Sequence, residues 1–224
     1  MGKYISKIVI LGDGGVGKTS LIKKFVHDEF SDDYISTIGG KISKKEINFG
    51  ENQLKLQIMD IPGQDTFSKL NRNNFMGAKG AIVVYDCTRK STFDRLEHWI
   101  GNLYDVVGQV PVMILGNKHD IIEHFQEDQG MQVAKNAPQE QFDAWIRENY
   151  SQVPDFYKKH PEFGEVTFDV ATYFNLIKFA QSKKNKWEKE FPYYQTSAST
   201  GKCVEKAFDK LGKLILEDIL NGQK

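Results

Sequence analysis

The stretch GDGGVGKTS at residues 12–20 constrains this chain more than any other part of its sequence. It carries the spacing Gly-x-x-x-x-Gly-Lys-Thr, with the apolar run KIVIL before it and the helical pattern LIKKFV after it. Glycine allows backbone conformations that other residues resist, so the N–H groups of such a loop can turn inward and form a nest for anionic oxygens. The pattern therefore predicts a phosphate-binding loop between a strand and a helix.

This loop predicts a site for a nucleoside triphosphate and its metal ion. Lys18 is expected to reach the outer phosphates, and the Thr19 hydroxyl is expected to bind Mg²⁺. The helix after the loop adds its positive N-terminal end. The predicted phosphate-binding residues of the loop are Gly14, Gly15, Val16, Gly17, Lys18, Thr19 and Ser20. Since the loop accepts any base, the base has to be inferred from other motifs.

Strand-like runs alternate with helical patterns along the chain. Strands are expected at 7–11, 44–49, 54–60, 81–86, 110–117 and within 191–198. Helices are expected at 18–27, around 93–103 and over 204–219. The alternation predicts an α/β fold with a mostly parallel six-stranded sheet and helices on both faces. Ligands of such sheets bind at the carboxyl ends of the strands, which is where the phosphate-binding loop lies.

The motif DIPGQ at 60–64 ends the third expected strand. Asp60 is placed to hold Mg²⁺ through water, and Gly63 can bring its N–H to the terminal phosphate. Gln64 is placed to orient a water molecule for attack on that phosphate. This motif adds hydrolysis to the predicted binding of a triphosphate.

Two further motifs predict the base. In NKHD at 117–120, the two oxygens of Asp120 match the N1–H and the exocyclic amine of guanine, a donor pair that adenine lacks. Asn117 and Lys118 would brace this pocket. In TSA at 196–198, the backbone around Ser197 and Ala198 is expected to contact the base, with the Ala198 N–H donating to guanine O6.

Taken together, the motifs resemble those of Ras-superfamily small GTPases, and most of all the Rab family. The resemblance covers residues 5–120 and 166–220 and rests on GDGGVGKTS, STIGG, LQIMDIPGQDTF, IVVYDCT, GNKHD and TSA. It implies the small G-protein variant of the P-loop NTPase fold, with GTP or GDP and Mg²⁺ as cofactors.

The resemblance also implies roles that spacing alone does not give. Thr37 would bind Mg²⁺ and the terminal phosphate in the GTP state, and Phe30 would stack on guanine. Loss of the terminal phosphate would release two switch segments. The implied catalytic residues are then Gln64, Lys18 and Thr37, and the implied metal ligands are Thr19, Thr37 and Asp60.

The chain departs from the Rab pattern in the segments that would contact partners. Effectors, exchange factors and GTPase-activating proteins are expected to bind about residues 30–45 and 60–78. Three aromatic positions of Rab proteins are Ile42, Met59 and Asn74 here, so effectors of ordinary Rab proteins are expected to bind weakly. Pro62 stands beside Gly63 where the family usually has alanine. Because proline restricts the backbone there, we expect this substitution to affect the rate of hydrolysis.

The stretch between NKHD and TSA is longer than in relatives. The chain is predicted to be one domain over 1–224, with an inserted helical segment at about 121–165. In that segment Phe142, Trp145, Ile146 and Tyr150 share one helical face. Docking on the neighbouring helix is one interpretation of this face, and an additional partner surface is the other.

Composition limits the remaining classes. Thirty basic residues balance 30 acidic ones, so no global charge favours nucleic acid or a membrane surface. Cys87 and Cys203 form no disulfide framework, and no apolar run is long enough to span a bilayer. We expect a cytoplasmic protein, with peripheral membrane association as the alternative. MGKYIS fits the myristoylation pattern, but Gly2 lies so near the first strand that we expect an unmodified start.

The sequence thus predicts a GTP-binding switch with slow, Mg²⁺-dependent hydrolysis, in a regulatory role of the trafficking or signalling kind. One alternative is an interaction module that binds nucleotide with little or no hydrolysis. The other is a P-loop kinase acting on a small acceptor, against which NKHD and the lack of an arginine-rich lid both count.

Overall fold

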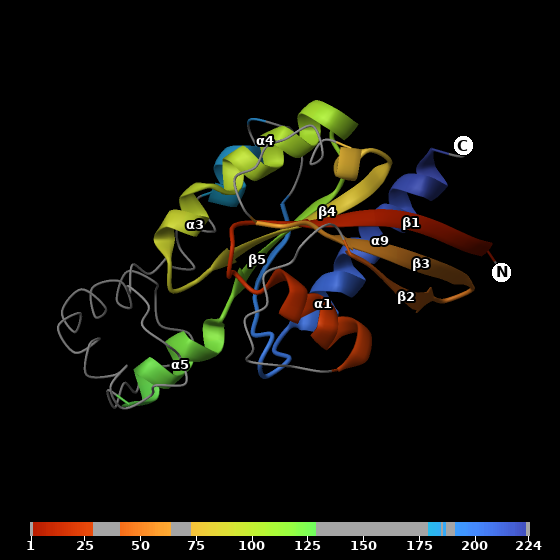
Figure 1. The fold of residues 1–224 in the computed structure, drawn as a ribbon. Coiled ribbons are helices and arrows are strands. Elements are labelled where there is room, and N and C mark those ends of the chain that lie inside the picture. Colours follow the sequence, from red (N-terminus) through yellow and green to blue (C-terminus); the bar gives the residue numbers. More distant parts are fainter. Residues whose placement is uncertain are drawn as a thin grey trace.

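A six-stranded sheet in the order β2-β3-β1-β4-β5-β6 runs through the computed structural model (Figure 1). The model describes residues 2–28, 41–63, 73–128, 179–184, 186 and 191–222. The strands are β1 (Gly2–Leu11), β2 (Lys41–Phe49), β3 (Asn52–Asp60), β4 (Ala78–Asp86), β5 (Val112–Asn117) and β6 (Tyr193–Gln195). β2 and β3 form an antiparallel hairpin, whereas β3, β1, β4, β5 and β6 are parallel to one another. The predicted fold class is confirmed.

Helices cover both faces of this sheet. They are α1 (Lys18–His27), α3 (Lys90–Asp94), α4 (Leu96–Val107), α5 (His119–Asp128) and α9 (Val204–Asn221). In Figure 1, α3 and α4 lie above the sheet and α1 lies below it. The bounds of α1 agree with the sequence-based prediction, because its apolar residues Leu21, Ile22 and Phe25 recur at helical spacing and are buried.

Each face of the sheet has its own hydrophobic core. On one face Trp99, Ile100 and Leu103 of α4 pack on β4 and β5. On the other face α1 and α9 pack on β1 and β3, and the rings of Phe25 and Phe208 stack with centroids 4.0 Å apart. The two cores hold the central strands rigidly from both sides, which fixes the positions of the strand ends.

Five strands begin at other residues than predicted, and two of them, β2 at Lys41 rather than 44 and β3 at Asn52 rather than 54, are extended by their pairing with each other. β1 begins at Gly2 rather than residue 7, because its backbone keeps pairing with β3 beyond the apolar run, from Gly2 opposite Asn52 onward. β4 likewise begins at Ala78 rather than 81. β5 begins at Val112 rather than 110, since Pro111 has no N–H to donate to a sheet.

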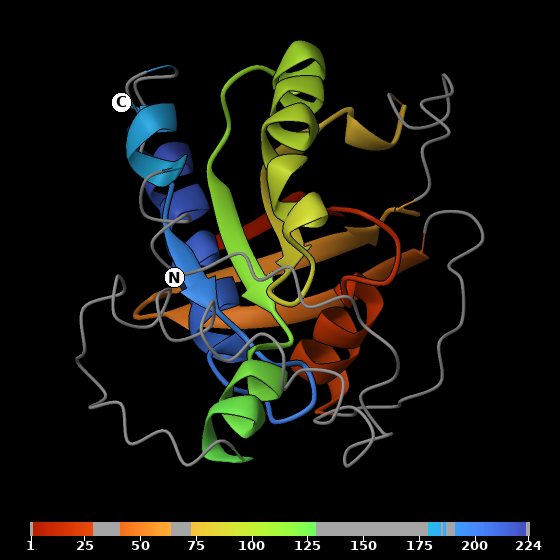
Figure 2. The ribbon, with the colours of Figure 1, turned by 90° about the vertical axis from the view of Figure 1, so that its left-hand side faces the viewer.

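The carboxyl ends of the parallel strands meet at one edge of the sheet, which Figure 2 shows from the front. The loops at 12–17, 60–63, 86–89, 117–120 and 196–198 all leave from this edge. The fold thereby gathers segments that are far apart in the sequence. Among the helices described, none is long and apolar enough to cross a membrane.

Candidate nucleotide-binding site

The loop between β1 and α1 has the open geometry that an anion needs. Gly17 precedes α1 with φ 95°, a left-handed conformation that favours glycine, and no side chain caps the helix. A Cβ at Gly17 would lie 2.2 Å from Asn117 Nδ2, so only glycine fits there. The first N–H groups of α1 therefore remain available to an anion.

Lys18 lies within this loop, and its ammonium group is held by the loop itself. Lys18 Nζ donates to Gly12 O at 2.7 Å and to Asp13 O at 2.8 Å. Burial lowers the pKa of Lys18 to about 8, although Asp60 and Asp13 act in the opposite direction. A phosphate oxygen would supply the negative charge that best stabilises this buried ammonium.

Two residues of the predicted metal set are in direct contact. The Thr19 hydroxyl donates to Asp60 Oδ2 at 2.5 Å, and Asp60 is buried at the end of β3. Magnesium prefers hard oxygen ligands, so a hydroxyl and a carboxylate side by side fit this ion. The Asp60 carboxylate also acts electrostatically on the ammonium of Lys18, so the predicted metal ligands lie next to the lysine that is predicted to bind phosphate.

Gly63 lies against the phosphate-binding loop. A Cβ at Gly63 would lie 2.4 Å from the carbonyl of Asp13 and 2.5 Å from the N atom of Gly14. This close approach brings Gly63 to the loop where the terminal phosphate is predicted.

Asn117 joins the phosphate-binding loop to the predicted base loop. Its Nδ2 donates to Val16 O at 2.9 Å, and its Oδ1 accepts from the Ala198 N–H at 3.1 Å. The Ala198 N–H, which the sequence predicted at guanine O6, thus has a protein acceptor in this structure. His119 N also donates to Thr196 O at 3.1 Å, which ties the two base motifs together.

A buried carboxylate that the sequence did not predict organises the neighbouring loop. Asp86, at the end of β4, accepts from Lys118 Nζ at 2.8 Å and from Arg89 Nε at 3.0 Å. Arg89 Nη2 in turn donates to Gly14 O at 2.9 Å. Although burial raises the pKa of Asp86, the charge of Lys118 and hydrogen bonds from Lys118 and Thr88 hold it below its usual value. Asp86 and Arg89 thus link the predicted base-contacting lysine to the phosphate-binding loop.

The remaining base residues lie where the loops converge. Asp120 is the second residue of α5 and is buried, and Ser197 is fully buried. The Ser197 hydroxyl accepts from Thr200 N at 3.0 Å and so shapes its own loop. Ser20 is half-buried in the first turn of α1.

The signal for Asp86 and Arg89 was present in the sequence, because DCTR follows a buried strand at the same edge of the sheet.

Several predicted residues and segments lie outside the described part of the chain. They are Phe30, Thr37, Gln64 and the rest of 64–72, and most of the inserted segment at 121–165. The three predicted partner positions do lie within it. Ile42 and Met59 are opposite each other in the β2–β3 register, Ile42 is 53% exposed, and Asn74 is half-buried.

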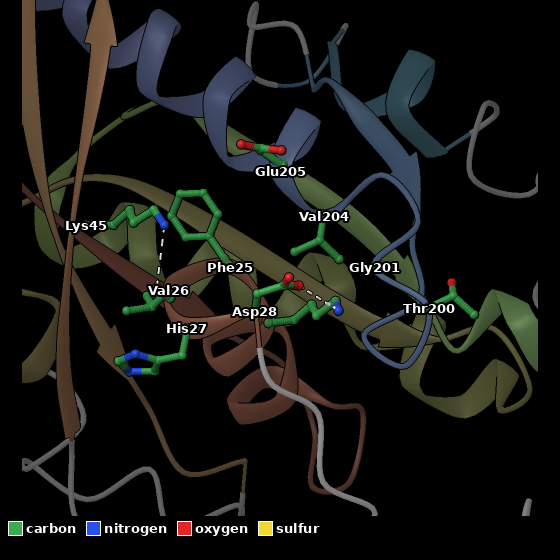
Figure 3. A pocket seen from close by; sticks show the side chains of 10 residues that line it. Phe25, Val26, His27, Asp28, Lys45, Thr200, Gly201, Val204 and Glu205 are labelled. Carbon is green, nitrogen blue, oxygen red and sulfur yellow. Dashed lines mark hydrogen bonds and ion pairs between the residues drawn. The ribbon is translucent and has the colours of Figure 1, made fainter.

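A pocket that no predicted site residue lines lies beside the base loop (Figure 3). Its volume is about 540 Å³, and it lies between the end of α1, β2 and the start of α9. Lys45 of β2 lines one side of it, with Nζ 5.5 Å from the centroid of the Phe25 ring, and Lys24 pairs with Asp28 at 2.7 Å. The charge of Lys24 is thus compensated within the protein.

Comparisons with known proteins agree with this geometry. The model of the Ras family matches residues 7–217. Rab-4A of Mus musculus is 31% identical over 221 residues, which cover 98% of this chain and 78% of Rab-4A. RABA6a of Arabidopsis thaliana is 36% identical over 136 residues, which cover 59% of this chain and 58% of RABA6a. The family match spans residues 7–217, and Rab-4A is similar over nearly the whole chain. The chain therefore belongs to the Ras family.

Proposed function

We propose that this protein is a GTP-binding switch that hydrolyses GTP slowly with Mg²⁺, in a trafficking or signalling role. Members of the Ras family bind GTP and GDP with Mg²⁺, and the relatives matched here are Ras-related proteins of the Rab type. The observation that carries the proposal is the Asn117 side chain, which contacts the phosphate-binding loop and the base loop at once.

Two regions of the site would bind the nucleotide, one at its phosphates and Mg²⁺ and the other at its base. Lys18 and the N-terminal end of α1 would bind the phosphates, with Gly63 at the terminal one. Asp120 would accept from the two N–H donors of guanine, and Asn117 and Lys118 would hold that pocket in shape. Thr19 and Asp60 would hold Mg²⁺, and Thr37 remains the predicted third ligand. Ser197 would support Ala198 at the base.

For hydrolysis, charge must be stabilised on the terminal phosphate as the bond to it breaks. Lys18 would supply a buried positive charge, and the Gly63 N–H would donate to the same group. Magnesium, when bound, neutralises negative charge on the phosphate oxygens. Gln64 stays the predicted residue that orients the attacking water, and Phe30 the predicted cover of the base. Pro62 leaves the Gly63 donor intact, so we expect slow hydrolysis that a partner accelerates.

The partner surfaces follow from the same proposal. The segments at about 30–45 and 60–78 would change with the bound nucleotide and would bind effectors, exchange factors and GTPase-activating proteins. Ile42, exposed beside Met59, offers an aliphatic contact where Rab proteins carry aromatic side chains. We propose that effectors of this chain differ from those of ordinary Rab proteins for that reason.

Base specificity gives the first test. In Asp120→Asn an NH2 donor replaces one of the two carboxylate oxygens that would accept from guanine. We therefore expect GTP affinity to fall by about 10³-fold or more and xanthosine triphosphate to bind better than GTP, because the carbonyl of xanthine accepts where guanine donates. Equilibrium titration with both nucleotides measures this. Asp105→Asn, the same change at an exposed residue in the last turn of α4, is the matched control. Unchanged GTP affinity in Asp120→Asn would show that Asp120 does not contact the base.

Single-turnover phosphate release separates the switch from the non-hydrolysing module. We expect release over minutes to hours with the wild-type protein and Mg²⁺, and none with Gln64→Leu. If the wild-type protein binds GTP but releases no phosphate over many hours, the interaction module is the correct interpretation. Preference for ATP over GTP would instead contradict the whole proposal.

A further inference from the structure

The phosphate-binding loop contains an acidic side chain that its predicted ligand does not explain. Asp13 lies between Gly12 and Gly14, and a carboxylate there repels phosphate through space. Its side chain is only 15% exposed, so bulk water screens it poorly. Something in the fold has to compensate this charge if the loop is to hold a triphosphate.

Two residues at the start of α4 contact the Asp13 carboxylate. Trp99 Nε1 donates to Asp13 Oδ1 at 2.8 Å, and Arg95 Nε lies 3.4 Å from the same oxygen. Arg95 also lies over the Trp99 ring, 6.0 Å from its centroid. The acid is thereby turned toward α4, where a positive charge and an N–H donor face it.

The anchor for this contact is rigid. Trp99 is 1% exposed and lies in the core with Leu96, Ile100 and Leu103 of the same helix. The indole therefore cannot shift without disturbing the packing between α4 and the sheet. A hydrogen bond from such a group fixes its acceptor as well.

The peptide that Asp13 belongs to is the one that the phosphate machinery uses. Asp13 O accepts from Lys18 Nζ at 2.8 Å, and Gly63 approaches the Asp13–Gly14 peptide so closely that a Cβ would not fit. Fixing the Asp13 side chain thus fixes the peptide that holds Lys18 and faces Gly63.

We propose that Trp99 and Arg95 are positioning residues that neutralise Asp13 and fix its peptide, so that the loop accepts the terminal phosphate. This rests on the proposed function, since it assigns two more residues to the same site. Neither residue was predicted from the sequence to belong to the site. They act through Asp13 and are not proposed to contact the nucleotide.

The test compares GTP and GDP affinities in variants that lack one of the two groups contacting the Asp13 carboxylate. Trp99→Phe keeps the ring but removes the N–H, and we expect it to weaken GTP binding about tenfold. Arg95→Gln removes the charge of a partly exposed pair, and we expect about a threefold loss. In both variants GDP affinity falls less than GTP affinity, because GDP lacks the phosphate nearest to Gly63. Lys90→Gln, which removes a positive charge paired with Asp94 on α3, is the matched control and leaves both affinities unchanged.

A second substitution distinguishes this role from a loss of packing. Asp13→Asn removes the repelling charge, so Trp99→Phe combined with Asp13→Asn is expected to bind GTP within about twofold of Asp13→Asn alone. Failure of Asp13→Asn to restore GTP binding would mean that Trp99 acts by packing, and would overturn the proposal. GTP affinity unchanged in both Trp99→Phe and Arg95→Gln would also overturn it.

Nucleotide binding by the wild-type protein distinguishes failure of this inference from failure of the proposed function. If wild-type protein binds no guanine nucleotide, the proposed function fails. If it binds GTP and GDP with Mg²⁺ but the Trp99 and Arg95 variants bind equally well, only the inference fails. Thermal unfolding of each variant without nucleotide reports the folded fraction used in the affinity calculation.

Discussion

At the scale of single residues, the charge of Lys18 depends on what occupies the loop. Its ammonium is buried against two carbonyl oxygens, and burial lowers its pKa to about 8. Phosphate oxygens nearby would favour the charged form and raise that pKa again. Binding and protonation of this side chain are therefore linked.

The linkage predicts proton uptake on nucleotide binding. Above about pH 8 the free protein has lost the Lys18 proton, so binding GDP at about pH 8.5–9 should take up a fraction of one proton, and affinity should fall as pH rises further. Calorimetry in two buffers of different ionisation enthalpy measures the uptake. No uptake at about pH 9 would contradict the pKa assigned to Lys18; His119, with a pKa lowered to about 4, does not titrate in this range.

The lowered pKa of Lys18 also makes the free energy of unfolding depend on pH. Between about pH 8 and the ordinary lysine value, the unfolded chain binds the Lys18 proton and the folded chain does not, so this group makes the nucleotide-free fold more stable as pH rises through that window. Bound nucleotide removes the effect because it restores the proton.

At the scale of elements, the aromatic stack between α1 and α9 holds the helix whose N-terminus forms the loop. Phe208→Ala is expected to lower the free energy of unfolding by about 3–5 kcal/mol, because the ring is fully buried and stacked on Phe25. Denaturant titration measures this. Phe208→Leu keeps apolar volume but removes the ring, so it is the control and should cost less. A loss near zero in Phe208→Leu would show that the stack itself is unimportant.

The sequence predicted the elements whose apolar residues repeat regularly, and it missed features that depend on contacts between distant segments. α1, the β2–β3 hairpin and the buried strands were predicted because their apolar residues repeat with the period of the element. The start of β1 at Gly2 was not, since sheet pairing with β3 is invisible in a polar segment. Within the site, Lys18, Asp60 and Asn117 lay in local motifs, whereas Asp13 and Trp99 are 86 positions apart and only the fold shows their contact.

At the scale of the whole molecule, the structure bears on where the inserted segment can begin. Its predicted start at 121 falls inside α5, and Ile121 and Ile122 are buried in the core beside α4. The first residues after NKHD therefore belong to the domain core, and the single domain over 1–224 with its insertion remains a prediction.

This placement gives a deletion test. Replacing 129–165 by a short Gly-Ser linker should leave GDP affinity and the melting temperature nearly unchanged, because α5 and its core contacts remain. Replacing 121–165 should lower the melting temperature by several degrees, because two buried isoleucines are lost. Fluorimetry with and without GDP measures both. Equal melting temperatures would show that α5 contributes nothing to the core.

The side chain of Asn117 has a mechanical consequence for nucleotide release. One amide joins Val16, in the loop predicted to bind the phosphates, to Ala198, in the loop predicted to contact the base. A protein that pulled on either segment would thus loosen the hold on both ends of the nucleotide together, and departure would occur in one step instead of end by end.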